Sequence, residues 1–343
     1  MLSAPRLQAS LCTLSLLLIP LCHNTLPVEE LAQNLDRLSV EEIRDRMELY
    51  IENKAGNEKL PGAAAALFRQ GTPLLWIHKG LAKNQRISIA SLNKPFTAMV
   101  LLRLSRTGKL DLDLPVIEYI PEWKEQSKSR TELAPITARM LLSHTSGIEY
   151  EAPGKDNSFE IGGKKYPIPV PSKVGKFNYS NYNYHLLAFL AYKVSDKPLT
   201  ALIQDWILEP AQMKQTSASA SNGAAGMVST LEDLTRFCEF LLSENAREAS
   251  PYYRVFRMFA NLQHRKSASE YGLGWHVYSP TNQAQLFYHS GTWYNAAAEI
   301  YIVPETSSYF VHIANPPNFK DRETIRYRAD ILKMGRLALT KAD

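Results

Sequence analysis

The sequence predicts an α+β fold in which strands from both ends of the chain form one antiparallel sheet, flanked by helices, beside a mostly helical middle. Strand-like apolar runs gather near the two ends, and helix-like apolar spacing fills the region between them. An isolated hairpin is only marginally stable in water, so we expect the strands of the two ends to pair with one another. With 343 residues, of which 45% are hydrophobic, the chain can bury a large core.

Composition narrows the classes of function. The 16 glycines and 20 prolines are too few for a collagen-like or low-complexity chain. Lysines and arginines number 39 against 34 aspartates and glutamates, and they form no long basic run. A nucleic-acid-binding protein usually carries a concentrated basic surface, so we expect no nucleic-acid partner.

The N-terminal segment has the pattern of a secretory signal. Arg6 is the only charge before the apolar run Leu11–Leu21, and acidic residues come only after that run. The run is shorter than the roughly 20 residues of a membrane-spanning helix. We therefore expect residues 1–24 to be a cleaved signal peptide and the protein to be exported, either periplasmic or secreted. The alternative is a lipoprotein held at a membrane through Cys22, which Leu21 disfavours as the preceding residue.

Cysteine usage predicts a fold without disulfides. Cys12 and Cys22 lie within or beside the signal segment, which leaves Cys238 alone in the mature chain. No intramolecular disulfide can form from a single cysteine. Because Cys238 lies inside the apolar helical stretch Leu234–Leu242, we expect it to be a small buried hydrophobic residue.

The N-terminal third begins with a helix and a hairpin. Ser39 to Glu42 forms a capping box, and the apolar residues that follow at helical spacing predict an amphipathic helix. Those residues are Ile43, Met47, Tyr50 and Ile51. Ala63–Phe68 and Leu74–His78 flank a short Gln-Gly-Thr turn and predict a hairpin. Pro95–Leu104 predicts a buried helix that Gly108 ends.

The middle and the C-terminal part supply the remaining elements. Predicted helices of the middle are Thr137–Ser143, Tyr184–Val194, Leu199–Leu208 and Thr230–Leu242. A capping box from Ser229 to Glu232 opens the last of them, and Pro153–Gly175 predicts a long surface loop. Predicted late strands and the closing helix are Trp275–Tyr278, Leu286–Tyr288, Glu299–Val303, Tyr309–Ile313 and Thr324–Leu337. We expect residues 25–343 to form a single domain with a helical subdomain at about residues 110–245.

Ser91 and Lys94 form the first candidate catalytic pair. They lie three residues apart where the predicted buried helix begins, so the hydroxyl and the amine share one helix face. A lysine can take the proton of a serine only if its own pKa is lowered, and the apolar residues around the pair provide burial that lowers it. For an isolated S-x-x-K pattern, the alternative is a capping serine beside a surface lysine.

Tyr179 and Asn181 form the second candidate pair. In an extended or turn segment, side chains two residues apart point to the same side. A phenol beside an ammonium loses its proton more easily, so Tyr179 and Lys94 can share one proton and relay it from Ser91 to a leaving group. Asn181 would orient the lysine or a substrate carbonyl. The alternative is a tyrosine-rich loop with Asn181 or Asn183 as the N-cap of the next helix.

His289, Gly291 and Thr292 form a third candidate segment at the end of a predicted strand. A glycine in this position lets a ligand backbone lie close to the strand. The backbone N–H of Thr292 and that of Ser91 can form an oxyanion hole. His289 can carry a positive charge near a substrate carboxylate, donate a proton or anchor a hydrogen bond. The alternative is an ordinary histidine at a strand-end turn.

In this order, Ser-x-x-Lys, Tyr-x-Asn and His-x-Gly resemble the serine β-lactamase-related family, which includes class C β-lactamases, D-Ala-D-Ala carboxypeptidases, D-aminopeptidases and esterases. Further strings between Pro61 and Asn315 are similar to the family in the same order. They are Arg86–Ser91, Gly108–Asp113, Leu141–Gly147, Ile207–Pro210, Gly226–Thr230 and Tyr271–Trp275. The resemblance implies a β-lactamase/transpeptidase-like fold.

The resemblance also implies a role for each motif residue. Ser91 would be the acylated nucleophile, Lys94 the general base and Tyr179 the acid/base partner. Asn181 would be an orienting amide. His289 would stand in the third motif, where the His-x-Gly form looks more like the peptidase branch than like class C β-lactamases.

Two further features concern the surroundings of the motifs. His144 and Trp275 lie in strings similar to the family, and we expect structural rather than chemical roles for both. After Gly291 the family often continues with a glycine-rich turn, whereas this chain has the bulky residues Trp293 and Tyr294, which would narrow the pocket. The chain between the second and third motifs is shorter than in class C β-lactamases, so the rim that faces the substrate should differ.

We therefore expect an exported serine hydrolase that forms an acyl-enzyme on Ser91 and acts on a D-amino-acid peptide, amide or ester. An esterase or β-lactamase of the same family is the first alternative. A non-hydrolysing binder of peptidoglycan fragments, β-lactams or a partner protein is the alternative from another class. The sequence has no G-x-S-x-G, H-E-x-x-H, paired C-x-x-C, P-loop or dinucleotide fingerprint, so we expect no metal and no cofactor.

Overall fold

The computed structural model describes residues 26–125, 133–149, 158–260, 269–280 and 284–341. The predicted signal segment, Cys22 and the first part of the predicted 153–175 loop lie outside these ranges. Among the described helices, none is both long and apolar enough to cross a membrane.

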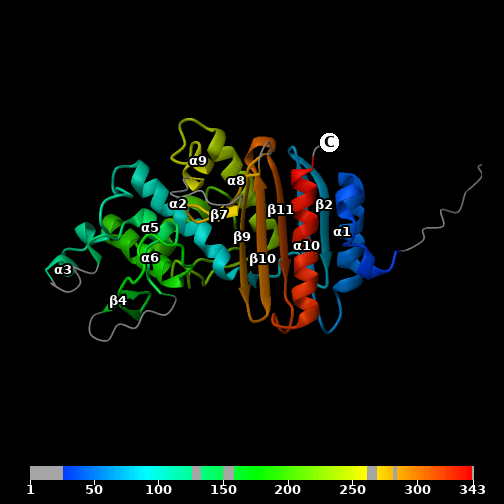
Figure 1. Ribbon diagram of the computed structural model, residues 1–343, viewed down its shortest axis with the longest axis horizontal. Coiled ribbons are helices and arrows are strands. Elements are labelled where there is room, and N and C mark those ends of the chain that lie inside the picture. The colour runs from blue at the N-terminus through cyan, green and yellow to red at the C-terminus, as the bar shows by residue number, and fades with distance from the viewer. Residues whose placement is uncertain (1–25, 126–132, 150–157, 261–268, 281–283, 342–343) are drawn as a thin grey trace, which may run out of the picture.

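Within the described ranges, seven antiparallel strands form the main sheet, in the order β2-β1-β11-β10-β9-β8-β7 (Figure 1). Their bounds are β1 Ala63–Arg69, β2 Thr72–Lys79, β7 Ser269–Tyr271, β8 His276–Tyr278, β9 Leu286–Trp293, β10 Ala296–Val303 and β11 Ser308–Ala314. β1 pairs with β11 from Ala63 opposite Ala314 to Phe68 opposite Tyr309. The prediction that strands of the two chain ends share one antiparallel sheet is confirmed.

Helices surround this sheet and fill the middle of the chain. The longer ones are α1 Val40–Lys54, α2 Asn93–Arg106, α6 Asn181–Ser195, α8 Leu231–Ala246 and α10 Arg322–Thr340. The short ones are α3 Pro121–Lys124, α5 Ala138–Leu142, α7 Leu199–Ile203 with a π-helical turn η5 at Gln204–Leu208, and α9 Val255–Phe259. Short 3-10 turns are η1 Val28–Glu30, η2 Leu35–Arg37, η3 Ala90–Leu92, η4 Val116–Tyr119 and η6 Pro304–Thr306. Two small two-stranded sheets join β3 Ile87–Ser88 to β6 Val228–Ser229, and β4 Ser158–Ile161 to β5 Lys164–Pro167.

The main sheet has an apolar layer on each side. Alternate residues of a strand point to opposite faces, and in β1 the side chains of Ala63 and Leu67 join the core beneath α1 and α10. Those of Ala64 and Ala66 join the other core, to which α8 and the helices of the middle contribute. Such a strand is apolar on both faces because helices cover both of them.

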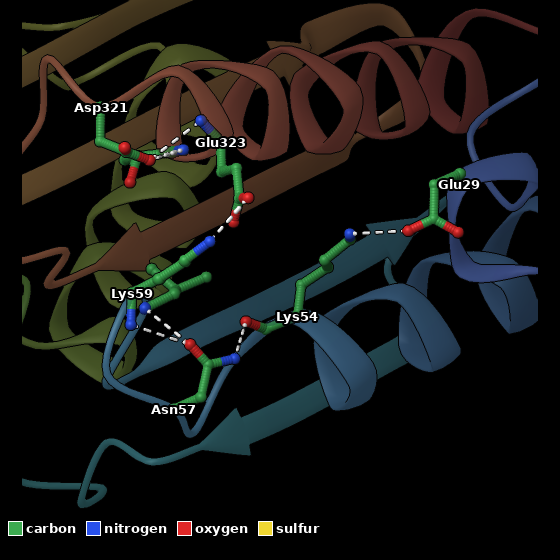
Figure 2. A network of polar contacts seen from close by, with 8 residues as sticks. Glu29, Lys54, Asn57, Lys59, Asp321 and Glu323 are labelled. Atoms are coloured by element: carbon green, nitrogen blue, oxygen red, sulfur yellow. Dashed lines mark hydrogen bonds and ion pairs between the residues drawn. The ribbon is translucent and has the colours of Figure 1, made fainter.

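A network of polar contacts connects the turn after α1 to the start of α10 (Figure 2). The Lys59 ammonium lies 2.7 Å from the Glu323 carboxylate at the start of α10, and both side chains are exposed. Asp321 caps that helix by accepting hydrogen bonds from two of its first backbone N–H groups, those of Glu323 and Thr324. On the other side, Asn57 Oδ1 accepts the Lys59 N–H at 2.9 Å and so holds the turn after α1.

Three local predictions were wrong, each because a nearby side chain or tertiary contact overrides a sequence signal. Part of the predicted 153–175 loop is the β4–β5 hairpin, which buries Phe159 and Tyr166 against the helical part. The N-cap of α8 is Thr230, whose hydroxyl accepts the Asp233 N–H, so the predicted Ser229–Glu232 box is displaced by one residue. The predicted strand 286–288 continues to residue 293, which places the third motif inside a strand.

Candidate active site

Ser91 lies in the 3-10 turn η3, directly before helix α2. The turn packs closely against β9. A Cβ on Gly291 of that strand would lie only 1.8 Å from the Ile89 carbonyl oxygen, so no side chain fits between the two backbones. Ala90, the residue before the serine, has a left-handed backbone with φ of 43°. An L-residue adopts that conformation only at an energetic cost, and such strain is typical of functional turns. The third-motif glycine therefore lies against the backbone of the nucleophile turn itself.

Lys94 is fully buried one helical turn after Ser91. Its Nζ lies 3.0 Å from Ser91 Oγ, 2.8 Å from Asn181 Oδ1 and 3.1 Å from the Ala224 carbonyl oxygen. Two of these three neighbours are acceptors only, whereas the serine hydroxyl can also donate. An uncharged amine has two N–H groups and one lone pair, so it can donate to the two acceptors and accept from Ser91.

Burial lowers the pKa of Lys94 well below its usual range. The shift favours the neutral amine, which is the form that can take a proton. The geometry and the direction of the shift thus agree, and the arrangement is that of a serine with a general base within hydrogen-bond reach.

Tyr179 lies between Lys94 and His144. The centre of its ring is 4.8 Å from Lys94 Nζ and 4.3 Å from the centre of the His144 ring. The first two sequence motifs, which are far apart in the chain, are therefore brought together around one amine.

Asn181 is the first residue of α6, and its side-chain oxygen accepts from Lys94. The N-cap of α6 is Ser180, whose hydroxyl accepts the Tyr182 N–H at 3.2 Å. The alternative in which Asn181 or Asn183 caps this helix is therefore wrong, because the cap lies between Tyr179 and Asn181. The Asn181 amide is left to orient the lysine.

His289 is buried on β9 beside the other motifs. Its Nδ1 lies 3.0 Å from the Ser290 carbonyl oxygen, so this nitrogen carries the hydrogen, and Nε2 accepts the Tyr271 hydroxyl at 3.0 Å. Burial, followed by the nearby His276 and Lys94, lowers the pKa of His289 well below its usual range. Among the roles expected for this residue, the structure favours a hydrogen-bond anchor over a positive charge.

The edge of β9 beyond Tyr288 faces the nucleophile turn. β8 pairs with β9 only at residues 286–288, and within the described residues no strand pairs with this edge at Gly291 or Thr292. Thr292 is exposed there, next to the turn that carries Ser91. Trp293 and Tyr294 are 56% and 74% exposed, and their rings pack edge to face on each other at the end of the strand.

Sequence reasoning missed two contributors to the site. Tyr271 is the partner of His289, and it also lies 3.5 Å from the Tyr184 hydroxyl. The Ala224 carbonyl oxygen comes from a turn that Asn222 closes, since its side-chain oxygen accepts two backbone N–H groups. The Asn222-Gly223 dipeptide is a turn signal that predicts such a bend, although nothing in it indicates that the bend reaches the lysine.

No cluster of potential metal ligands occurs in the described part of the chain. The candidate site is built from a hydroxyl on η3, an amine on α2, a phenol in the segment before α6, an amide on the first residue of α6 and an imidazole on β9. A serine hydroxyl within hydrogen-bond reach of a neutral amine is an arrangement that can support acyl transfer to the serine.

Comparisons with known proteins identify a matching family and similar folds. A family model described as Beta-lactamase matches residues 43–333. Protein flp of Staphylococcus aureus (strain MW2) is 24% identical over 320 residues, which cover 79% of this chain and 63% of that protein. The matched region thus spans less than two thirds of this relative. A D-stereospecific amidohydrolase from Streptomyces sp. has a similar fold, with a TM-score of 0.61, 20% identity and coverage of 82% of this chain and 96% of its own. A class C beta-lactamase also has a similar fold, with a TM-score of 0.66 and 17% identity. The match covers 88% of this chain and 97% of that protein.

Proposed function

The chain belongs to the beta-lactamase family, whose model matches residues 43–333, and we propose that it is a serine hydrolase that works through an acyl-enzyme on Ser91. The observation that carries the proposal is the 3.0 Å contact between Ser91 Oγ and the fully buried Nζ of Lys94. Among the described residues, the hydrogen-bond partners of this buried lysine are a hydroxyl, an amide oxygen and a carbonyl oxygen, so the amine is suited to remain neutral and to act as a base.

Acylation begins when Ser91 Oγ forms a bond to the substrate carbonyl carbon and its proton passes to Lys94 Nζ. The carbonyl electron pair moves to the oxygen, which accepts hydrogen bonds from the backbone N–H groups of Ser91 and Thr292. The bond to the leaving group then breaks, and the leaving group takes a proton from Tyr179. Lys94 returns its proton to Tyr179, which restores both groups.

Deacylation repeats these steps with water as the nucleophile. The water oxygen bonds to the acyl carbon while its proton passes to the neutral Nζ of Lys94 in the Lys94–Tyr179 pair. The bond to Ser91 Oγ breaks, and the serine recovers a proton from the same pair. The acid product leaves, and each catalytic group returns to its starting state.

The proposed substrates are amides, esters or peptides of D-amino acids. The similar fold of a D-stereospecific amidohydrolase supports this class. Within it, the uncharged His289 favours substrates whose leaving group has no free carboxylate, since a buried neutral imidazole does not attract an anion. A D-aminopeptidase-like amidase therefore ranks before a D-Ala-D-Ala carboxypeptidase, and hydrolysis of β-lactams ranks after both.

Export to the periplasm or the medium is part of the proposal. It is supported by the charge and apolar pattern of residues 1–24. N-terminal sequencing of the protein from separated cell fractions tests it, because retention of the full N-terminus in the cytoplasm would contradict export. A lipid on Cys22 would appear as an added mass and as detergent-dependent solubility.

Labelling with an active-site reagent tests the proposed chemistry. The mature protein is incubated with a fluorophosphonate or a fluorescent penicillin, and the added mass is located by peptide mass spectrometry. We expect one label on Ser91, no label in Ser91→Ala and normal labelling in Ser105→Ala, a serine near the C-terminal end of α2 and outside the site. Equal labelling of wild type and Ser91→Ala would overturn the proposal. Labelling of Ser91 together with no hydrolysis of D-amino-acyl p-nitroanilides or p-nitrophenyl esters by the unlabelled protein would favour the non-hydrolysing binder.

A further inference from the structure

His144 accepts hydrogen bonds from the residues on both sides of Tyr179. It is fully buried and has a left-handed backbone with φ of 57°. Its carbonyl oxygen accepts the Asn178 N–H at 2.8 Å, and its ring Nδ1 accepts the Ser180 N–H at 3.1 Å. The residue between these two anchored amides is Tyr179, whose ring also packs 4.3 Å from the imidazole centre.

The hydrogen bonds define the state of the His144 ring. A backbone N–H can only donate, so Nδ1 must present its lone pair to Ser180. The Asn183 side-chain nitrogen also lies 3.1 Å from Nδ1, and its oxygen accepts the Ser146 hydroxyl at 2.6 Å, which orients the amide. A proton on Nδ1 would point at two donors. The ring is therefore neutral, with its hydrogen on Nε2, where it has no hydrogen-bond partner among the described residues.

We propose that His144 is a positioning residue that fixes the Tyr179 hydroxyl for proton transfer to the leaving group, a role that rests on the proposed function. His144 constrains Tyr179 in three ways: it binds the N–H of the preceding residue, it binds the N–H of the following residue, and its ring packs on the tyrosine ring. A displacement of a catalytic group by about 1 Å can cost 100-fold in rate, so such constraints matter to the reaction as well as to the fold.

Two substitutions separate the hydrogen-bond acceptor from the rest of the ring. His144→Asn keeps an acceptor near the position of Nδ1, and asparagine tolerates the left-handed backbone better than most residues. It loses only the unpartnered Nε2–H and the ring. His144→Phe keeps a ring and removes the acceptor from Ser180. His144→Gln, which lacks an acceptor at the δ position, replaces the phenylalanine variant if that variant does not fold.

The readout is the ratio of kcat/KM for two substrates with the same D-amino-acyl group, a p-nitroanilide and a p-nitrophenyl ester. The anilide needs a proton on its leaving nitrogen, whereas p-nitrophenolate leaves without one. Both rates come from one preparation, so the fraction of folded protein cancels from the ratio. Tyr179→Phe provides the ratio expected when the proton donor is lost.

We expect the anilide-to-ester ratio of His144→Phe to fall by at least about tenfold, toward that of Tyr179→Phe, and His144→Asn to recover most of it. An unchanged ratio in His144→Phe would overturn the positioning role, even if both rates fell together. A ratio in His144→Asn as low as in His144→Phe would overturn the assignment to Nδ1. Failure of the wild type to acylate on Ser91 would instead overturn the proposed function, so the two failures are distinct.

Discussion

Gly291 lies so close to Ile89 that a Cβ on the glycine would come within 1.8 Å of the Ile89 carbonyl oxygen and 2.8 Å of the Leu92 nitrogen. Strand β9 and the turn that carries Ser91 are therefore in backbone contact. The sequence alone predicts that this glycine lets a ligand backbone lie close to the strand. The structure shows that the approaching backbone is the protein's own, and that the glycine sets the distance between nucleophile and strand.

Replacement of Gly291 by alanine is expected to disrupt the site more than the fold. The added methyl cannot fit unless η3 moves away from β9, which displaces Ser91 from Lys94. We expect the rate of Ser91 acylation to fall by at least about 100-fold. Gly108→Ala is the control, because Gly108 has a positive φ but open space around it, so this variant loses stability without disturbing the site. Gly291→Ala that acylates at the wild-type rate would contradict the steric argument.

The acylation rate is expected to depend on pH through Lys94. Burial lowers the pKa of this amine, so it stays neutral to a lower pH than a free lysine, and it becomes protonated as the pH falls through the lowered value. The pH profile of acylation should therefore have a falling acidic limb. Lys94→Arg keeps a charge at every accessible pH, and we expect a loss of about 10²–10⁴-fold with no such limb. Stopped-flow labelling across the pH range measures the acylation rates of wild type and Lys94→Arg. If Lys94→Arg had the same falling acidic limb as the wild type, the titrating group would be a residue other than Lys94.

A buried ionic cluster between the sheet and α10 is expected to contribute to stability. Glu299 on β10 lies opposite His312 on β11, and its Oε2 is 2.8 Å from His312 Nδ1, while Oε1 contacts Arg328. Burial alone would raise the pKa of Glu299, but these two partners outweigh it and lower it. We expect Glu299→Gln to reduce the free energy of unfolding by about 3–5 kcal/mol, because it leaves the charge of a buried pair without its partner.

The stability difference between wild type and Glu299→Gln should shrink in acid. A lowered carboxylate pKa contributes stability above the unfolded-state value, about 4.3, and this contribution is lost as the pH falls through the folded value. Urea unfolding at several pH values measures it. Glu323→Gln, in the exposed pair with Lys59, should change little at any pH. A difference that stayed constant down to acid would contradict the ionised carboxylate.

The charge state of His289 predicts a preference among substrates. A D-alanine amide or methyl ester should be hydrolysed faster than a peptide that ends in a free D-alanine carboxylate, since the buried imidazole offers no positive charge. We expect at least about a tenfold difference in kcat/KM, the size of one lost ionic contact. Chromatographic product analysis of the amide, the methyl ester and the free-carboxylate peptide measures this difference, and the matched L-substrates serve as controls. Faster turnover of the free carboxylate would point to a cation elsewhere in the site and restore the carboxypeptidase alternative.

Much of the architecture follows from local patterns in the sequence. β1 is apolar on both faces, which a strand tolerates only when helices cover both sides of its sheet. The pairing of Ser91 with Lys94 was also predictable, because spacing on a helix determines which side chains meet.

The missed features depend on contacts between distant segments. The hydroxyl of Tyr271 is the partner of His289, and the carbonyl of Ala224 is a partner of Lys94, although neither residue lies in a motif that predicts it. The β4–β5 hairpin is stabilised where Phe159 stacks on Tyr166 and both pack against the helical part. The glycine, proline and lysine content of this segment predicts a surface loop, and the sequence alone does not indicate that these two aromatic side chains are buried.

The pairing of β1 with β11 also constrains how the molecule is made. Strand β1 lies beside β11, which comes about 240 residues later in the chain, so this ladder cannot close until β11 has left the ribosome. Closing contacts between such distant parts of a chain is slow, because the entropy of the long loop opposes it. During synthesis the apolar β1 lacks its β11 neighbour, and a chaperone that binds extended apolar segments would find its target there.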